Sequence, residues 1–208
     1  MNLTIPYSFA STLRRLLIPA LIGAAAVLSG CSAMQAQNPS EGFGPVNAVP
    51  SDSGERLMLK GHDVVSYFTD NKHAMGTPQF KTVYKGVTFQ FANAAHKALF
   101  DKTPEKYLPE FGGYCANGIV YGIPWGGDGD TWTMHEGKLY IFGGAGSKAP
   151  FMLDVPGNVA LAKKYWAEEV NGSNSFIQRA KRLTFKVPHY KNGDELAKMV
   201  EQAKPAAK

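Results

Sequence analysis

The most chemically versatile side chain in this sequence is Cys115, in the stretch FGGYCANG at positions 111–118. A cysteine can be a small buried hydrophobic residue, and free cysteines are often fully buried. It can also bind copper(I) or zinc through its thiolate. A third role, as a reactive thiol, requires a nearby cation or helix end that lowers its pKa. The neighbouring residues do not select one of these three roles.

Five histidines are the other candidate metal ligands. His73 lies in the polar stretch TDNKHAMG and His189 lies in the C-terminal tail, so we expect both to be solvated. The other three, together with Cys115, could supply two or three nitrogens and one sulfur, a set that suits copper or zinc. These three histidines are His62, His96 and His135.

Spacings that mark common catalytic centres do not occur in this sequence. It has no G-x-S-x-G, no H-E-x-x-H and no C-x-x-C. The glycine-rich stretch GIPWGGDGD (122–130) lacks the G-K-[ST] of a phosphate-binding loop, and we expect it to be a loop over the Cys115 region. An enzyme is therefore the least favoured function, and it would use Cys115 as its nucleophile or redox centre.

The N-terminus predicts that the protein is exported. Arg14 and Arg15 precede an apolar run, LLIPALIGAAAVL (16–28), which is too short to cross a bilayer. This order of charge and apolar residues is typical of a signal peptide, which we place at residues 1–30.

The end of this signal looks like the bacterial lipobox, Leu28-Ser29-Gly30-Cys31, in which Cys31 receives the lipid. The alternative is an ordinary signal cut near 34–37, which would discard Cys31. Several acyl chains hold a protein on a membrane well, because each buried methylene contributes about 0.8 kcal/mol. Ser32, in place of aspartate, indicates the outer membrane of a Gram-negative host. We expect a lipid-anchored protein that faces the oxidising periplasm, where Cys115 must be buried or bound to a ligand.

The composition is that of one globular domain. Removal of residues 1–30 leaves 178 residues, enough for a single hydrophobic core. Hydrophobic residues make up 44% of the chain and aromatic residues 12%, which excludes a disordered chain. The net charge of +5 falls to +3 without the signal, and no basic face with interleaved aromatic residues suggests nucleic acid as a partner.

The amino-acid composition also divides the part of the chain after the signal into three segments. Residues 31–54 are rich in Ser, Pro, Gly, Asn and Gln and predict a flexible tether. Residues 55–172 form the predicted domain. Residues 173–208 carry 8 Lys or Arg against 3 Asp or Glu. This basic extension could contact anionic lipid or glycan, although a solvated extension is the simpler interpretation; the protein partner is unknown.

Two segments favour β-structure. VVSYF (64–68) and TVYKGVTFQFA (82–92) are rich in β-branched and aromatic residues, and Lys85-Gly86 predicts a hairpin turn within the second. A second hairpin is predicted in residues 131–143, around Glu136-Gly137.

Helices are expected between and after these strands. Asn93 is suited to cap a helix that runs to Phe100, and Thr103-Pro104 to begin another helical turn. The best helix pattern is 158–170, with Asn158 as its cap and Gly172 just beyond its end. Strands and short helices in alternation predict a small α+β fold.

Five blocks stand in order along the chain: GHDVVSYF (61–68), KGVTFQFANAAHKALF (85–100), PEKYLPEFGGYC (104–115), TWTMHEGKLYIF (131–142) and AKKYW (162–166). Together they resemble the YHS-domain family in its exported, lipoprotein form, over about residues 58–170. The resemblance implies a small α+β domain in which a β-hairpin leads into a helix. Members fused to copper pumps and metal reductases are taken to bind soft metal ions.

The sequence departs from the metal-handling members after the second strand. Those members carry a pattern like F-C-S-x-x-x-C, whereas here Ala92 and His96 occupy the cysteine positions. The two-thiolate site of those members is therefore absent here. Their metal-binding function cannot be assigned in full to this protein.

The resemblance also draws attention to Asp63, which either forms a cap or Asx-turn on the first strand or accepts a hydrogen bond from a ligand. Tyr67 and Tyr114 either line a pocket or are core residues whose hydroxyls bond to the backbone. The leading hypothesis is a lipid-anchored periplasmic module that binds copper, zinc or a small ligand near Cys115. The alternative is an envelope interaction or scaffolding lipoprotein in which Cys115 is structural.

Overall fold

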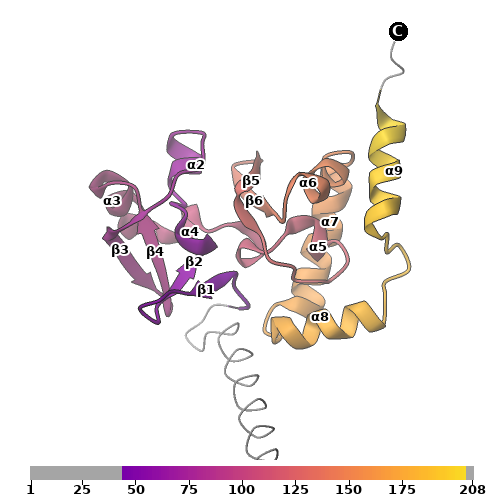
Figure 1. Cartoon of the computed structure of the whole chain (residues 1–208), viewed down its shortest axis with the longest axis horizontal. Helices are drawn as coiled ribbons and strands as arrows, with labels where there is room; N and C mark the ends of the chain where they lie inside the picture. The colour runs from indigo at the N-terminus through magenta and orange to yellow at the C-terminus, as the bar shows by residue number, and fades with distance from the viewer. Residues whose placement is uncertain (1–43, 205–208) are drawn as a thin grey trace, which may run out of the picture. The chain divides into compact units, whose positions relative to one another are not determined.

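The computed structural model describes residues 44–204 (Figure 1). The predicted signal, Cys31 and the first part of the predicted tether lie outside the described residues. Helices and strands alternate along the described part, so the predicted α+β class is confirmed. No helix within residues 44–204 combines the length and the apolar character that a membrane span requires.

A four-stranded sheet forms the first half of the described chain, in the order β1-β2-β4-β3. The antiparallel pair β3–β4 is the hairpin predicted at Lys85-Gly86, where both residues have positive φ (49° and 74°). Two-residue turns of this kind match the twist of the strands. The strands are β1 (Ala48–Pro50), β2 (Arg56–Met58), β3 (Thr77–Tyr84) and β4 (Val87–Phe91).

Strand β1 lies inside the stretch 31–54 that composition assigned to a tether, so that prediction is wrong for this part. Val46 is buried, and β1 pairs antiparallel with β2. The Asn47 amide donates to the carbonyls of Gly113 and Gly127, at 3.0 and 2.9 Å. These contacts come from residues more than 60 positions away, which local composition cannot reveal.

The strand predicted at VVSYF (64–68) is also wrong. The chain forms a turn, η1 (Leu59–Gly61), and then the short helix α2 (Ser66–Thr69). The Asp63 side chain accepts the Val65 N–H at 2.9 Å, and the Ser66 hydroxyl donates to the Asp63 carbonyl at 2.7 Å. A short apolar run fits a buried strand or a buried helical segment equally, and these local hydrogen bonds favour the helical turn.

Short helical elements follow the first hairpin. Asn93 caps the first of them as predicted, because its side chain accepts the His96 N–H at 2.8 Å. Pro104 begins the second, also as predicted. The elements are α3 (Ala94–Lys102), α4 (Pro104–Tyr107), η2 (Glu110–Gly113) and α5 (Ala116–Ile119).

The second predicted hairpin is confirmed. Strands β5 (Asp128–His135) and β6 (Lys138–Phe142) pair antiparallel across Glu136 and Gly137, whose φ values are 50° and 69°. Strand β5 begins three residues earlier than predicted and takes in the end of the glycine-rich stretch. The earlier part of that stretch lies against Cys115, whose N–H donates to the Trp125 carbonyl at 2.9 Å.

Helix α6 (Ala145–Phe151) leads to α7 (Val155–Tyr165), which continues as a π-helical segment, η3 (Trp166–Val170). The cap predicted at Asn158 is wrong. Asp154 caps α7 by accepting the Gly157 N–H at 3.0 Å, and Asn158 lies within the helix. Pro156 in the first turn suits this earlier start.

The basic extension contains two helices, α8 (Ser175–Thr184) and α9 (Gly193–Ala203). Asn192 and Glu195 form a capping box at the start of α9. Gln178 and Val187 are buried. A solvated extension is therefore the wrong interpretation for the part that contains α8.

Two hydrophobic clusters meet at strand β6. Leu139 and Ile141 belong to the cluster around the four-stranded sheet, whereas Tyr140 and Phe142 belong to the cluster around α5, α6 and α7. Successive side chains of a strand point to opposite faces. The second hairpin therefore joins the two clusters, and the chain segments that connect them form the candidate site.

Candidate functional site

The thiol of Cys115 is enclosed by the core. The residue is 3% exposed, and it pairs with Ile141 through an isolated β-bridge. A Cβ atom on Gly143 would lie 3.9 Å from the sulfur. The expectation that this thiol is sheltered is confirmed, and the core surrounds it as it would a small hydrophobic residue.

The three candidate histidines occupy separate environments. His62 Nδ1 lies 2.8 Å from the Leu59 carbonyl oxygen, and the His135 ring lies 6.4 Å from the Tyr140 ring. His96 is engaged by Asp63. Within residues 44–204, no three His, Cys, Asp or Glu side chains are close enough to share a metal ion. The structure does not bring the predicted copper or zinc ligands together.

Asp63 and His96 form a buried pair. His96 Nδ1 lies 2.6 Å from Asp63 Oδ2, and this N–H donates because the carboxylate can only accept. The same carboxylate accepts the Ala92 N–H at 2.8 Å and the Val65 N–H at 2.9 Å. Of the two roles expected for Asp63, these contacts show the Asx-turn and add a link from α2 to α3.

The far side of the imidazole faces Thr69, whose Oγ1 lies 3.3 Å from His96 Nε2. Carboxylate, imidazole and hydroxyl stand in the order of a nucleophilic triad. However, the Thr69 hydroxyl is placed to donate to the Val65 carbonyl at 3.1 Å or to Asp70 at 2.9 Å. Because these oxygens engage the Thr69 hydroxyl, it is not held for activation by the imidazole, and we regard the group as structural.

Both candidate tyrosines are core residues. The Tyr67 hydroxyl donates to the Gly129 carbonyl at 2.6 Å, and the Tyr114 hydroxyl donates to the Val46 carbonyl at 3.2 Å. Burial raises the pKa of each phenol above its ordinary value. Neither tyrosine lines the pockets described below.

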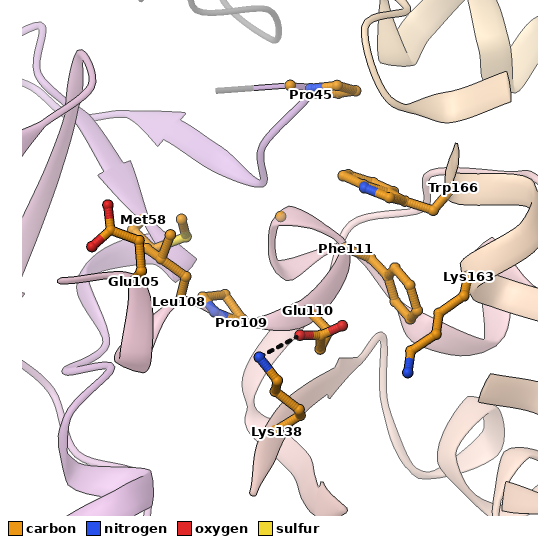
Figure 2. Close-up of a pocket in the computed structure, with 12 residues that line it drawn as sticks. Pro45, Met58, Glu105, Leu108, Pro109, Glu110, Phe111, Lys138, Lys163 and Trp166 are labelled. Carbon is orange, nitrogen blue, oxygen red and sulfur yellow. Dashed lines mark ion pairs between the residues drawn. The ribbon is translucent and has the colours of Figure 1, made fainter. Parts of the chain in front are cut away.

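The best-formed pocket lies a few residues before Cys115 along the chain (Figure 2). Its volume is about 290 Å³, near the lower end of the range for small-molecule sites. Glu105 and residues 108–112 supply one part of its wall, and Lys163 and Trp166 supply another. The rest of the lining comes from Gly44, Pro45, Met58 and Lys138.

A left-handed backbone segment shapes this pocket. Phe111, Gly112 and Gly113 have φ values of 56°, 59° and 77°. A Cβ atom on Gly112 would lie 2.4 Å from the Pro45 carbonyl oxygen, so only glycine fits there. Phe111 carries a strain of roughly 1–2 kcal/mol. In this left-handed conformation the Phe111 ring lies in the core, and its centroid is 5.7 Å from the Trp166 ring centroid.

Trp166 lies where α7 changes from α-helix to π-helix. The Asn171 N–H donates to the Trp166 carbonyl at 2.8 Å, which is an i→i+5 bond. Single π turns are rare and frequently occur at functional sites. The partly buried indole lies beside Phe111 (Figure 2).

The charged groups of the pocket differ in whether they have an ion-pair or hydrogen-bond partner. Lys138 Nζ lies 3.6 Å from a Glu110 oxygen. Glu105 accepts the Tyr84 hydroxyl, and this hydrogen bond lowers the pKa of the carboxyl group. Lys163 has no carboxylate partner within residues 44–204. The pocket therefore offers one ammonium group to an incoming anion.

A second pocket, of about 600 Å³, lies beside β2 and β3. Hydroxyl and carboxylate groups of the Ser51–Glu55 turn line it together with Lys81. Lys81 already donates to Glu55 at 2.6 Å. Ligand sites are mostly apolar with a few convergent polar groups, and the first pocket fits this description better.

Sequence reasoning did not single out the residues that define the first pocket. Phe111, Lys138, Lys163 and Trp166 all stand in the blocks quoted for the family resemblance, and the Gly-Gly pair after Phe111 was the available signal of an unusual backbone. No family model, curated protein or solved structure matches this chain.

Proposed function

We propose that this protein is a lipid-anchored module of the cell envelope that binds a small amphipathic anion in the pocket beside Phe111. The ligand has an apolar, ring-sized body and one carboxylate or similar group. The observation that carries the proposal is that Lys163, whose ammonium has no carboxylate partner within residues 44–204, lines the same pocket as the rings of Phe111 and Trp166.

The expected location rests on the N-terminal sequence. The signal and the lipobox-like Cys31 predict an anchor that leaves the domain in the periplasm. The family resemblance supports the same site, because the pocket wall draws on the blocks 104–115 and 162–166.

Apolar contact supplies the attraction for the body of the ligand. Phe111, Trp166, Leu108 and Pro109 line the pocket. Each square ångström of apolar surface removed from water contributes about 25 cal/mol, and an aromatic ligand also gains from edge or offset stacking on the rings.

Lys163 selects the charge of the ligand. An ammonium–carboxylate hydrogen bond is roughly twice as strong as a neutral one. Glu105 and Glu110 are already engaged by Tyr84 and Lys138. A cationic ligand would find no free carboxylate among these residues, whereas an anion would neutralise Lys163.

We place the ligand in this pocket and not at a copper or zinc centre, because the histidines and Cys115 are not assembled in the described part of the chain. The alternative function, an interaction lipoprotein with a structural cysteine, is favoured by the burial of Cys115. The two functions differ in whether the pocket binds a small molecule.

Calorimetric titration with 2-naphthoate, a ring with one carboxylate, tests the proposal. We expect saturable binding, with 2-naphthylmethanol, the neutral analogue, about tenfold weaker. Lys163→Gln should weaken naphthoate binding by about tenfold as well, which corresponds to 1.4 kcal/mol.

Lys164→Gln is the matched control, because this neighbouring lysine is exposed and does not line the pocket. Equal affinities for the two lysine variants would contradict the proposed anion site. A chain that binds neither compound would favour the interaction function.

A further inference from the structure

Helix α8 faces the body of the protein with its polar side chains. Ser175 and Gln178 are buried. The Gln178 amide donates to the Gly122 carbonyl at 3.1 Å. Arg179 donates to the Pro124 carbonyl at 3.0 Å, and Arg182 Nε donates to Glu169 at 2.7 Å. These hydrogen bonds hold α8 across the end of α7 (Figure 1).

The apolar side chains of α8 face away from the protein. Phe176, Ile177 and Leu183 are 49%, 57% and 41% exposed, and Phe185, just beyond the helix, is 70% exposed. Successive residues of a helix are 100° apart, so these positions lie opposite Gln178 and Arg182. A surface helix normally buries its apolar stripe, and α8 does the reverse.

Trp125 is a further partly exposed apolar residue next to α8. Its indole is 41% exposed, and the Arg179 guanidinium lies 5.3 Å from its ring centroid. Contiguous exposed apolar surface rimmed by polar groups marks an interaction site. We call the outward side chains of Phe176, Ile177, Leu183, Phe185 and Trp125 the α8 face.

The charges around the α8 face are mostly positive, with Glu169 in η3, at the end of α7, bound to Lys181 and Arg182. Residues 171–193 contain five Lys or Arg and no Asp or Glu. Lys181 and Lys186 are exposed beside the apolar side chains. A surface that combines aromatic and aliphatic side chains with flanking cations matches the interface of an anionic bilayer.

We propose that the α8 face lies on the surface of a bilayer that carries anionic phospholipid, with its apolar side chains below the headgroups. A second copy of the chain is a poor occupant, because a symmetric contact would bring the same cations together. The lipid expected on Cys31 would raise the local concentration of the face at the membrane. The face itself is defined by α8 and does not depend on the small-molecule pocket.

Fluorescent probes at single cysteines test this orientation. The experiment uses the full chain after processing in cells. This chain carries Cys115→Ala together with either Ile177→Cys or Phe185→Cys. The introduced cysteine is labelled with a polarity-sensitive nitrobenzoxadiazole dye. The chain is reconstituted into phosphatidylcholine vesicles with or without phosphatidylglycerol. Lys102→Cys, on the exposed end of α3, is the matched control site.

We expect the dyes at positions 177 and 185 to shift to shorter wavelength and to be quenched at least twofold by nitroxides on the lipid acyl chains. Phosphatidylglycerol should strengthen the quenching, and Lys181→Gln with Lys186→Gln should remove that strengthening. The dye at position 102 should stay in water.

Dyes at 177 and 185 that remain in water on both kinds of vesicle would overturn the proposal. A blue shift in detergent that grows with protein concentration and needs no bilayer would also overturn it, in favour of a second copy of the chain.

Discussion

At the scale of single residues, Asp63 shows how one buried side chain fixes several segments. It is fully buried. Its two oxygens accept N–H groups from Val65, Ala92 and His96. A buried carboxylate is tolerated only when hydrogen bonds replace water. This one closes the turn before α2 and ties it to the start of α3.

Asp63→Ala should lower the free energy of unfolding by about 3 kcal/mol, because removal of one partner leaves buried polar groups without hydrogen bonds. Urea denaturation of the variant measures this loss. Asp70→Ala is the control: Asp70 lies 3.5 Å from the opposite nitrogen of His96 but is more exposed, so we expect a loss of under about 0.5 kcal/mol. Similar losses for the two variants would show that the buried pair has no special structural role.

At the scale of elements, the η2 segment determines whether the pocket exists. Its backbone adopts left-handed conformations at three successive residues, 111–113. The aromatic wall therefore depends on a turn that is unfavourable for Phe111 and accessible to the two glycines. The surrounding contacts compensate for the strain, a pattern that is common at binding sites.

Gly112→Ala should lower the free energy of unfolding by at least about 2 kcal/mol, because the new Cβ would meet the Pro45 carbonyl and the left-handed φ is unfavourable for alanine. It should also weaken naphthoate binding, measured by the calorimetric titration above.

Gly146→Ala provides the comparison. Gly146 lies in α6 with open space around it, so alanine there should leave stability unchanged or raise it by up to about 1 kcal/mol. If Gly112→Ala were as harmless as Gly146→Ala, the η2 backbone could not be under the constraint described.

At the scale of the whole molecule, the two hydrophobic clusters are coupled through β6. Cys115 pairs with this strand at Ile141 and is enclosed. Exposure of its thiol therefore requires a large part of the molecule to open. In an oxidising compartment, this burial protects a cysteine that has no disulfide partner in the described part of the chain.

Cys115 in the folded chain should react with a thiol reagent at least about a thousandfold more slowly than in the urea-unfolded chain, as expected if exposure needs about 4 kcal/mol of opening. Ellman's reagent and absorbance measure both rates. Lys72→Cys introduces an exposed thiol and should react at the unfolded rate. Rapid labelling of Cys115 itself would instead indicate an accessible, reactive thiol.

The sequence by itself determined the features that depend on neighbouring residues. The hairpin turns at Lys85-Gly86 and Glu136-Gly137, the cap at Asn93 and the helix start at Pro104 follow from local backbone and hydrogen-bond preferences. The α+β class followed from the alternation of these elements. The export signal and the lipidation of Cys31 remain predictions from sequence.

Only the tertiary structure decided which distant groups meet. The strand β1 within the predicted tether and the pocket between Phe111 and Trp166 both depend on contacts between segments far apart in the chain. The structure also separated Cys115 from the histidines, which no spacing could exclude. Amphipathic periodicity alone predicts that the apolar side of α8 is buried. In the structure, Gln178 and Arg182 form hydrogen bonds to the body of the protein, and the apolar side faces outward.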